Sequence, residues 1–155
     1  MIQGLLAEEV EFVVIGGVAA VAHGSTYQTN DLDICYRVTA PNLNRLCAVL
    51  QRWKAYPRDW EPGHAFAADP RTLKVTPTLN LRTTEGFLDV LSGVTGLNGY
   101  ATARKRSDEV TAFSLRFRVL SLQALIVAKE AAGRPKDLML LPELRALQEL
   151  RDSGG

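Results

Sequence analysis

The chain reads Phe12-Val13-Val14-Ile15-Gly16-Gly17 near its start and, fourteen residues after Gly17, Asp31-Leu32-Asp33. The apolar run 12–15 predicts a strand covered on both faces, and the small residues 18–24 predict a short helix. A strand that leads through two glycines into a helix offers backbone N–H groups to an anion, because no Cβ blocks its approach. The sequence therefore predicts a phosphate-binding turn at Gly16-Gly17.

The second segment places two acidic side chains together. Residues 31–36 alternate in the manner of a strand, in which residues two apart face the same way, so Asp31 and Asp33 share one face. Two carboxylates without a basic neighbour in sequence repel each other unless a cation joins them. Mg²⁺ binds oxygen ligands and commonly uses one or two carboxylates together with substrate phosphates. The pattern therefore favours a divalent-metal site beside the phosphate turn.

Asp89 is a third acid in an apolar setting. Residues 78–83 and 87–91 flank Thr84-Glu85-Gly86, which predicts a β-hairpin with Asp89 in the middle of its second strand. A carboxylate in such a place is costly to bury without a partner. Three explanations are open: Asp89 pairs with an Arg or Lys, lies on a solvated sheet face, or joins Asp31 and Asp33 as a third metal ligand.

The other elements are predicted from periodicity and turn residues. Pro41 and the apolar spacing of 41–53 predict an amphipathic helix, and Ser121 and Gly133 are suited to begin and end a helix between them. Residues 56–63 contain two prolines and a glycine and are predicted to form a loop, either one wall of a cleft or plain surface. Further expectations are an opening helix at 3–9, a connector at 93–99, a short helix at 100–107, strands at 109–113 and 115–119, a helical region from 134 to about 150 that Pro142 breaks or restarts, and a frayed end at 152–155.

Length and composition indicate one globular domain spanning 1–155, with a core at about 10–120 and a C-terminal helical region at about 121–150. Apolar residues make up 46% of the chain, charged residues 23%, and the net charge is +1, so no excess of basic charge points to nucleic acid. No apolar stretch approaches the roughly 18 residues that span a bilayer, and no signal pattern is present at the N-terminus. The cytoplasm is the expected location.

Taken together, Val14-Ile15-Gly16-Gly17, Asp31-Leu32-Asp33-Ile34 and the later Asp89 resemble the minimal nucleotidyltransferases of the DNA polymerase beta superfamily. That family has an apolar residue, Gly, then Gly or Ser, a spacer, an acid-x-acid strand and a third acid from a later strand. The sequence looks closest to the small members grouped with the AbiEii-type toxins. The residues that carry this finer likeness are His23-Gly24, Thr29-x-Asp31-Leu32-Asp33 and Ala128-Lys129-x-x-x-Gly133-Arg134-x-Lys136-Asp137.

The resemblance implies an α+β fold of the α/β two-layer kind, with a mixed β-sheet packed by helices and with C-terminal helices. It implies an enzyme that moves a nucleoside monophosphate from a nucleoside triphosphate to an acceptor hydroxyl and releases pyrophosphate. Asp31, Asp33 and Asp89 would hold two Mg²⁺ ions, with Mn²⁺ able to substitute, and pyrophosphate would leave toward Gly16-Gly17. The acceptor (RNA, protein or small molecule) is open, and the toxin likeness implies a cognate antitoxin protein as a partner.

Three basic residues, Lys129, Arg134 and Lys136, are candidates for neutralising the phosphates, although capping and solvating helix ends would equally explain them. Two positions depart from the family pattern: Gly17 stands where many relatives carry Ser, and Tyr27 stands where relatives often carry a basic residue. Three other function classes are open. They are a catalytically silent nucleotide-binding or toxin–antitoxin module, a metal-dependent phosphohydrolase of the aspartyl-phosphate type, and a purely structural domain, which would need none of the three acids.

Overall fold

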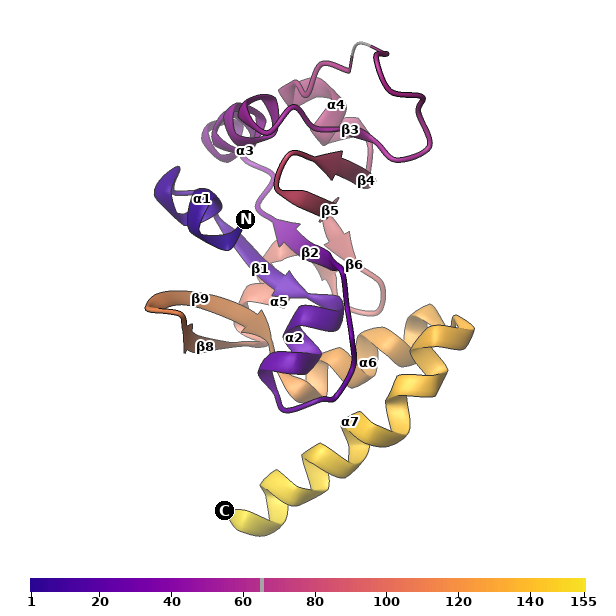
Figure 1. Ribbon diagram of the computed structural model, residues 1–155. Helices are drawn as coiled ribbons and strands as arrows, with labels where there is room; N and C mark the ends of the chain where they lie inside the picture. Colours follow the sequence, from indigo (N-terminus) through magenta and orange to yellow (C-terminus); the bar gives the residue numbers. More distant parts are fainter. Residues whose placement is uncertain (65) are drawn as a thin grey trace.

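The computed structural model describes residues 1–64 and 66–155 and shows a mixed β-sheet with helices packed around it (Figure 1). The sheet has seven strands in the order β3-β4-β5-β2-β1-β9-β8. Strand β2 is antiparallel to β1 and parallel to β5, and β1 is parallel to β9. The strands of this sheet are β1 (Phe12–Ile15), β2 (Asp31–Tyr36), β3 (Tyr56–Pro57), β4 (Thr78–Thr83), β5 (Gly86–Leu91), β8 (Ser107–Ala112) and β9 (Leu115–Leu120).

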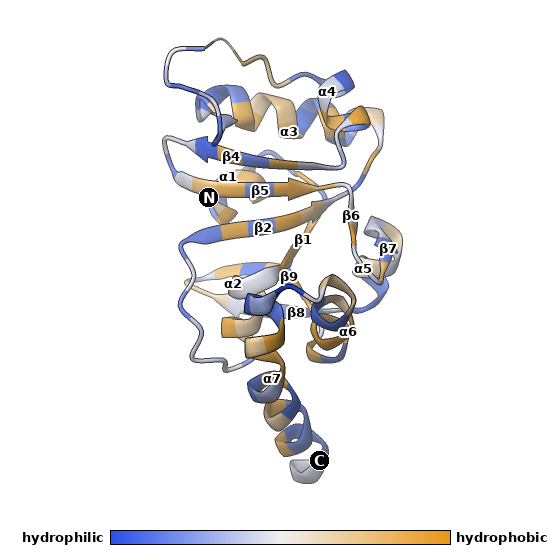
Figure 2. Cartoon of the chain, turned by 90° about the vertical axis from the view of Figure 1, so that its right-hand side faces the viewer, coloured by the Kyte–Doolittle hydropathy of each residue, from blue (hydrophilic) through white to orange (hydrophobic). Residues whose placement is uncertain are grey.

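The centre of the sheet is apolar and buried. Val13, Val14, Ile34 and Val90 of the inner strands are completely inaccessible to solvent. Figure 2 shows the same trend, with hydrophobic colour concentrated on the inner strands and on the faces of the helices that meet them. The β-branched run 12–15 forms a strand because both of its faces are covered, as its composition predicts.

Helices α2 and α5 lie against the central strands β1 and β2, and four other helices lie toward the two ends of the sheet. Figure 1 shows α3 and α4 near β3 and β4, and α6 and α7 at the opposite end, with the C-terminal half of α7 running away from the sheet. None of the helices in the described part of the chain is both long enough and apolar enough to cross a membrane. The helices are α1 (Ile2–Ala7), α2 (Gly16–Ala22), α3 (Ala40–Arg52), α4 (Pro70–Val75), α5 (Tyr100–Lys105), α6 (Leu122–Ala132) and α7 (Pro135–Gly154).

Helix α6 forms where its end signals predict it. The Ser121 hydroxyl accepts a hydrogen bond from the Ala124 backbone N–H at 3.2 Å, and Gly133 ends the helix in the left-handed conformation with φ +62°. The sequence therefore fixes both ends of α6, which forms one wall of the cavity described below.

Two expectations about the chain were wrong. Residues 93–99 are more than a connector, because β6 (Gly93–Val94) and β7 (Asn98–Gly99) form a small antiparallel ribbon. Pro142 lies inside α7 and does not break it, and the helix continues through the expected frayed end. Burial of the apolar side chains around Pro142 offsets the hydrogen bond that proline cannot make. These side chains are Leu140, Leu141 and Leu144.

Candidate active site

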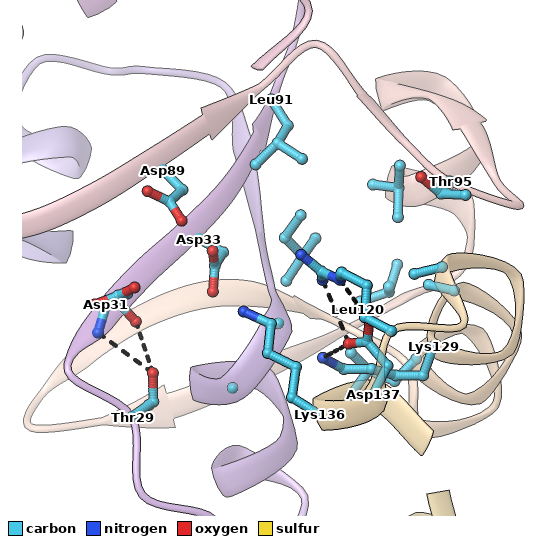
Figure 3. Close-up of a pocket in the computed structure, with 18 of the residues that line it drawn as sticks. Thr29, Asp31, Asp33, Asp89, Leu91, Thr95, Leu120, Lys129, Lys136 and Asp137 are labelled. Carbon is cyan, nitrogen blue, oxygen red and sulfur yellow. Dashed lines mark hydrogen bonds and ion pairs between the residues drawn. The ribbon is translucent and has the colours of Figure 1, made fainter. Parts of the chain in front are cut away.

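Three carboxylates come together on one side of the sheet. Asp33 of β2 pairs in register with Asp89 of the parallel neighbour β5, and Asp31 lies two residues before Asp33 on the same strand. Figure 3 shows the three side chains from these two strands pointing into the same space. The parallel pairing of β2 and β5, which the sequence could not give, is what brings Asp89 to the other two acids.

Gly16 makes the close approach to these acids possible. Its φ is +66°, and a Cβ built on it would lie 2.3 Å from the Asp33 Oδ2 atom. A side chain at this position would therefore be strained in its backbone and would push the Asp33 carboxylate away. The glycine lets the turn into α2 lie against the carboxylate.

Replacing Gly16 by Ala should lower the free energy of unfolding by about 2–4 kcal/mol, because backbone strain and a steric clash add. Urea unfolding of the variant measures this. Gly133→Ala is the matched control, since Gly133 also has a positive φ, +62°, but its Cβ would come no nearer than 3.7 Å to the Glu130 carbonyl oxygen. The control should cost only about 1 kcal/mol. Equal losses for the two variants would show that contact with Asp33 is unimportant.

The two departures from the family pattern, Gly17 and Tyr27, are linked. A Cβ on Gly17 would lie 2.9 Å from the Tyr27 Cε1 atom and 2.8 Å from the Thr29 Cβ atom. The segment that carries Tyr27 and Thr29 therefore occupies the space that a serine side chain at position 17 would need. Any anion contact at this turn comes from backbone N–H groups.

Arg58, which the sequence did not single out, bridges two of the three acids. Its Nη1 atom donates to the Asp31 Oδ2 atom at 3.0 Å, and its Nη2 atom donates to the Asp89 Oδ1 atom at 2.6 Å. Residue 58 lies in the segment expected to be a loop, in which only Tyr56 and Pro57 form a short strand. Asp89 therefore both pairs with an arginine and lies beside Asp33, so two of the three explanations for it apply. The proline-bearing loop at 56–63, interpreted as a possible cleft wall, was the only feature of the sequence that pointed toward Arg58.

Asp33 lacks such a partner in the described part of the chain. Burial, followed by repulsion from and hydrogen bonding with Asp89 and by repulsion from Asp31, raises the pKa of Asp33 to about 7, although Lys129 opposes the shift. Burial and the two neighbouring carboxylates thus oppose ionisation of Asp33.

This pKa has a consequence for stability in the absence of metal. Because the folded-state pKa lies above the unfolded value of 3.8, Asp33 supports folding below about pH 4, and that support is lost as the pH rises through 7. In EDTA at pH 8, Asp33→Asn should therefore be more stable than wild type by roughly 1–3 kcal/mol, after allowance for solvent screening. The difference should disappear near pH 4. Urea unfolding at both pH values measures it, and a gain of the same size at both would contradict the assignment.

The basic candidates from the end of the chain have two different environments. Asp137 is completely buried and accepts from the Lys129 Nζ atom at 2.7 Å and from the Arg134 Nε atom at 2.6 Å. Burial alone would raise the pKa of Asp137, but these hydrogen bonds hold it below its ordinary value. Lys136 is exposed, makes no ion pair within residues 1–64 and 66–155, and points from the start of α7 toward the acids (Figure 3).

The acids, the glycine turn and the three basic candidates line one cavity of about 190 Å³. The acids and the glycine turn form its polar end, and side chains of β5, β6 and α6 form an apolar wall. A second, larger groove of about 820 Å³ adjoins it and includes Arg58, Trp60 and Phe66. Thr78 and Asn80 line both spaces. The sequence-predicted residues in the first cavity are Gly16, Gly17, Asp31, Asp33, Asp89, Lys129, Arg134 and Lys136.

The acids suit a divalent cation by chemistry but are not arranged around one. Three carboxylates are hard oxygen ligands, and Asp33 makes no ion pair with a basic residue that the structure describes. Within the described residues, however, no three His, Cys, Asp or Glu side chains are placed to hold a metal ion. The Arg58 guanidinium is bound to two of the three acids that would be needed. The three carboxylates would suit the ion once Asp31 and Asp89 are released from Arg58.

Comparison with solved structures shows which fold this is. The chain superposes on the antibiotic-resistance factor ANT(2'')-Ia with a TM-score of 0.58 at 14% identity, covering 98% of this chain and 89% of that one. It superposes on the lincosamide antibiotic adenylyltransferase LnuA with a TM-score of 0.59 at 14% identity, covering 94% and 92% of the two chains. A nucleotidyltransferase-like protein from Paracoccidioides brasiliensis matches with a TM-score of 0.52 at 15% identity, covering 96% and 72%.

No protein-family model matches the sequence, and no curated protein matches it either. The likeness therefore lies in the fold: a nucleotidyltransferase-type mixed sheet with C-terminal helices, as the resemblance implied. At these identities the chemistry has to be argued from this chain's own residues.

Proposed function

We propose that this protein is a metal-dependent nucleotidyltransferase, which moves a nucleoside monophosphate from a nucleoside triphosphate to an acceptor hydroxyl. The observation that carries the proposal is the register of β2 and β5, which places Asp89 opposite Asp33 beside the Gly16 turn. Three acids from two strands next to a glycine turn, within a nucleotidyltransferase-type fold, form a constellation suited to this reaction.

The roles of the residues follow from their places in the cavity. Asp31, Asp33 and Asp89 would hold two Mg²⁺ ions, which when bound stabilise charge on the attacking and leaving oxygens. The backbone N–H groups of Gly16-Gly17 and the Lys136 ammonium would bind the departing pyrophosphate. Lys129 and Arg134 are held by Asp137, so they would set the potential of the cavity wall. The apolar wall would receive the base and the ribose.

The bond changes balance within this arrangement. The acceptor hydroxyl gives its proton to a carboxylate, its oxygen attacks the α-phosphorus, and the bond from that phosphorus to the bridging oxygen breaks as pyrophosphate leaves. Asp89 is our candidate for the proton acceptor, because its strand lies between β2 and β4 and so is nearest the larger groove. The acceptor would then enter from the groove beside Trp60.

The decisive experiment incubates the protein with each labelled nucleoside triphosphate, with Mg²⁺ or Mn²⁺, and with RNA, protein or small-molecule acceptors. Transfer predicts pyrophosphate release and label on an acceptor, and both should require Asp33. A phosphohydrolase would instead release inorganic phosphate. Two structural neighbours are an antibiotic adenylyltransferase and ANT(2'')-Ia in complex with adenylyl-2''-tobramycin, so ATP and small hydroxylated molecules are the first pair to test.

One observation favours a second candidate, a silent nucleotide-binding module. Arg58 holds Asp31 and Asp89, and the described residues contain no set of three placed for a metal. If this candidate is correct, nucleotide will bind, as measured by calorimetry, without pyrophosphate release under any metal condition. Transfer that depends on Asp33 rules it out.

The toxin–antitoxin setting is a separate proposal that rests on the sequence resemblance. It predicts that expression of the wild-type chain alone arrests bacterial growth and that Asp33→Asn does not. Growth that is unaffected by the wild-type protein would remove the toxin role and would leave the nucleotidyltransferase proposal standing.

A further inference from the structure

The Arg58 side chain is fixed in the acid site by more than its two ion pairs. Its Nε atom donates to the Leu81 carbonyl oxygen at 3.3 Å, and its guanidinium lies 4.7 Å from the centroid of the Phe87 ring. Its backbone N–H donates to the Asn80 carbonyl oxygen at 2.9 Å. The side chain is about 27% exposed, and the Asp89 side chain about 13%. The guanidinium is therefore held in a defined position in the site.

Arg58 occupies one carboxylate oxygen on each of Asp31 and Asp89, two acids that a divalent ion in this site would need. The guanidinium uses the Asp31 Oδ2 and Asp89 Oδ1 atoms, and an ion placed a few ångström from it would be repelled by its positive charge. Asp33 forms no ion pair with the described residues, so it remains as the first point of attachment for an incoming ion. A guanidinium fork and a metal ion are alternative ways to neutralise the same pair of carboxylates.

We propose that Arg58 is an internal counter-ion that competes with the divalent ion for Asp31 and Asp89 and is released when the ion binds. The inference rests on the proposed function only in taking the three carboxylates as metal ligands. It adds that, in the metal-free protein, Arg58 itself opposes binding of the ion to the site. It also explains why no set of three acids in the described residues is arranged for a metal.

Release of Arg58 can be followed by the fluorescence of a nearby tryptophan, Trp60. Trp60 lies two residues after Arg58, and its ring packs edge-on against Phe66 at a centroid distance of 5.7 Å. Arg58, Trp60 and Phe66 line the larger groove together. Because Arg58 and Trp60 line the same groove, we expect movement of the Arg58 side chain to change the surroundings of the Trp60 ring, which is 43% exposed. The other tryptophan, Trp53, is 7% exposed and buried in the core.

The first measurement is the affinity for Mn²⁺ without nucleotide. The electron paramagnetic resonance signal of the free ion reports how much Mn²⁺ is bound. Arg58→Ala should bind Mn²⁺ roughly 10-fold more tightly than wild type, because the competitor is gone. Arg58→Lys keeps the charge but lacks the fork, so its affinity should lie between those two. Arg82→Ala is the matched control, since Arg82 lies over the same Phe87 ring at 5.2 Å and makes no ion pair with an acid among the described residues. The control should change affinity less than about 3-fold.

The second measurement uses Mg²⁺, which does not quench fluorescence. Titration of wild type should change the tryptophan emission, whereas Arg58→Ala should show little change, because its side chain has no contacts to release. Trp60→Phe identifies the source of the signal, since the remaining Trp53 should not respond to the ion.

The outcomes separate the inference from the proposed function. Mn²⁺ binding that depends on Asp33 but is equal in wild type and Arg58→Ala overturns the inference and leaves the metal site intact. An increase in Mn²⁺ affinity for Arg82→Ala as large as that for Arg58→Ala also overturns it, because the increase would then come from removing a positive charge at long range. If none of the variants binds Mn²⁺, both the inference and the metal-dependent function fail.

Discussion

Replacing Asp33 by Asn should reduce nucleotidyl transfer by about 10³-fold or more while the protein stays folded. The substitution removes one of three ligand carboxylates and the negative charge that draws a divalent ion into the cavity. It leaves the shape of the side chain unchanged, and it relieves repulsion from Asp89 and Asp31. Pyrophosphate release and the thermal midpoint, measured on the same samples, test both halves of this expectation.

Asp108→Asn is the control for this substitution. Asp108 is half-exposed, and its one ion pair within the described residues is a long one, 4.0 Å, with Arg151, away from the acid site. Its rate should equal that of wild type. A wild-type rate for Asp33→Asn would remove the assignment of the active site, and a lost rate accompanied by unfolding would place Asp33 in a structural role.

Replacing Asp137 by Ala should lower the free energy of unfolding by about 3–5 kcal/mol, the cost of leaving a buried charge without its partner. Asp137 is fully buried and the Lys129 side chain is only 14% exposed, so water cannot readily replace the lost carboxylate. Urea unfolding measures the loss. Asp137→Asn retains a hydrogen-bond acceptor for Lys129 and should cost less than Asp137→Ala.

Glu130→Ala is the matched control for this variant. The Glu130–Arg145 pair is about as short, at 2.6 Å, but both side chains are about half exposed. Its loss should cost no more than about 1 kcal/mol. If Asp137→Ala and Glu130→Ala cost the same, burial of the Lys129–Asp137–Arg134 cluster contributes nothing to stability.

Local patterns determined much of the fold and part of the site. The β-branched run 12–15 and the ends of α6 could be placed because neighbouring residues along the chain decide them. The strand period alone puts Asp31 and Asp33 on one face. Pro142 was misjudged because its effect depends on what α7 packs against, which the local sequence does not contain.

The sequence by itself thus determined the glycine turn, the shared face of Asp31 and Asp33, and the presence of a third acid in an apolar strand. Only the tertiary structure decided that β5 lies parallel to β2, that Arg58 joins Asp31 to Asp89, and that Asp137 holds Lys129. The physical reason is range. Side-chain direction follows from backbone geometry over two to four residues, whereas charge partners 27 or 31 positions apart meet only after the whole sheet has packed.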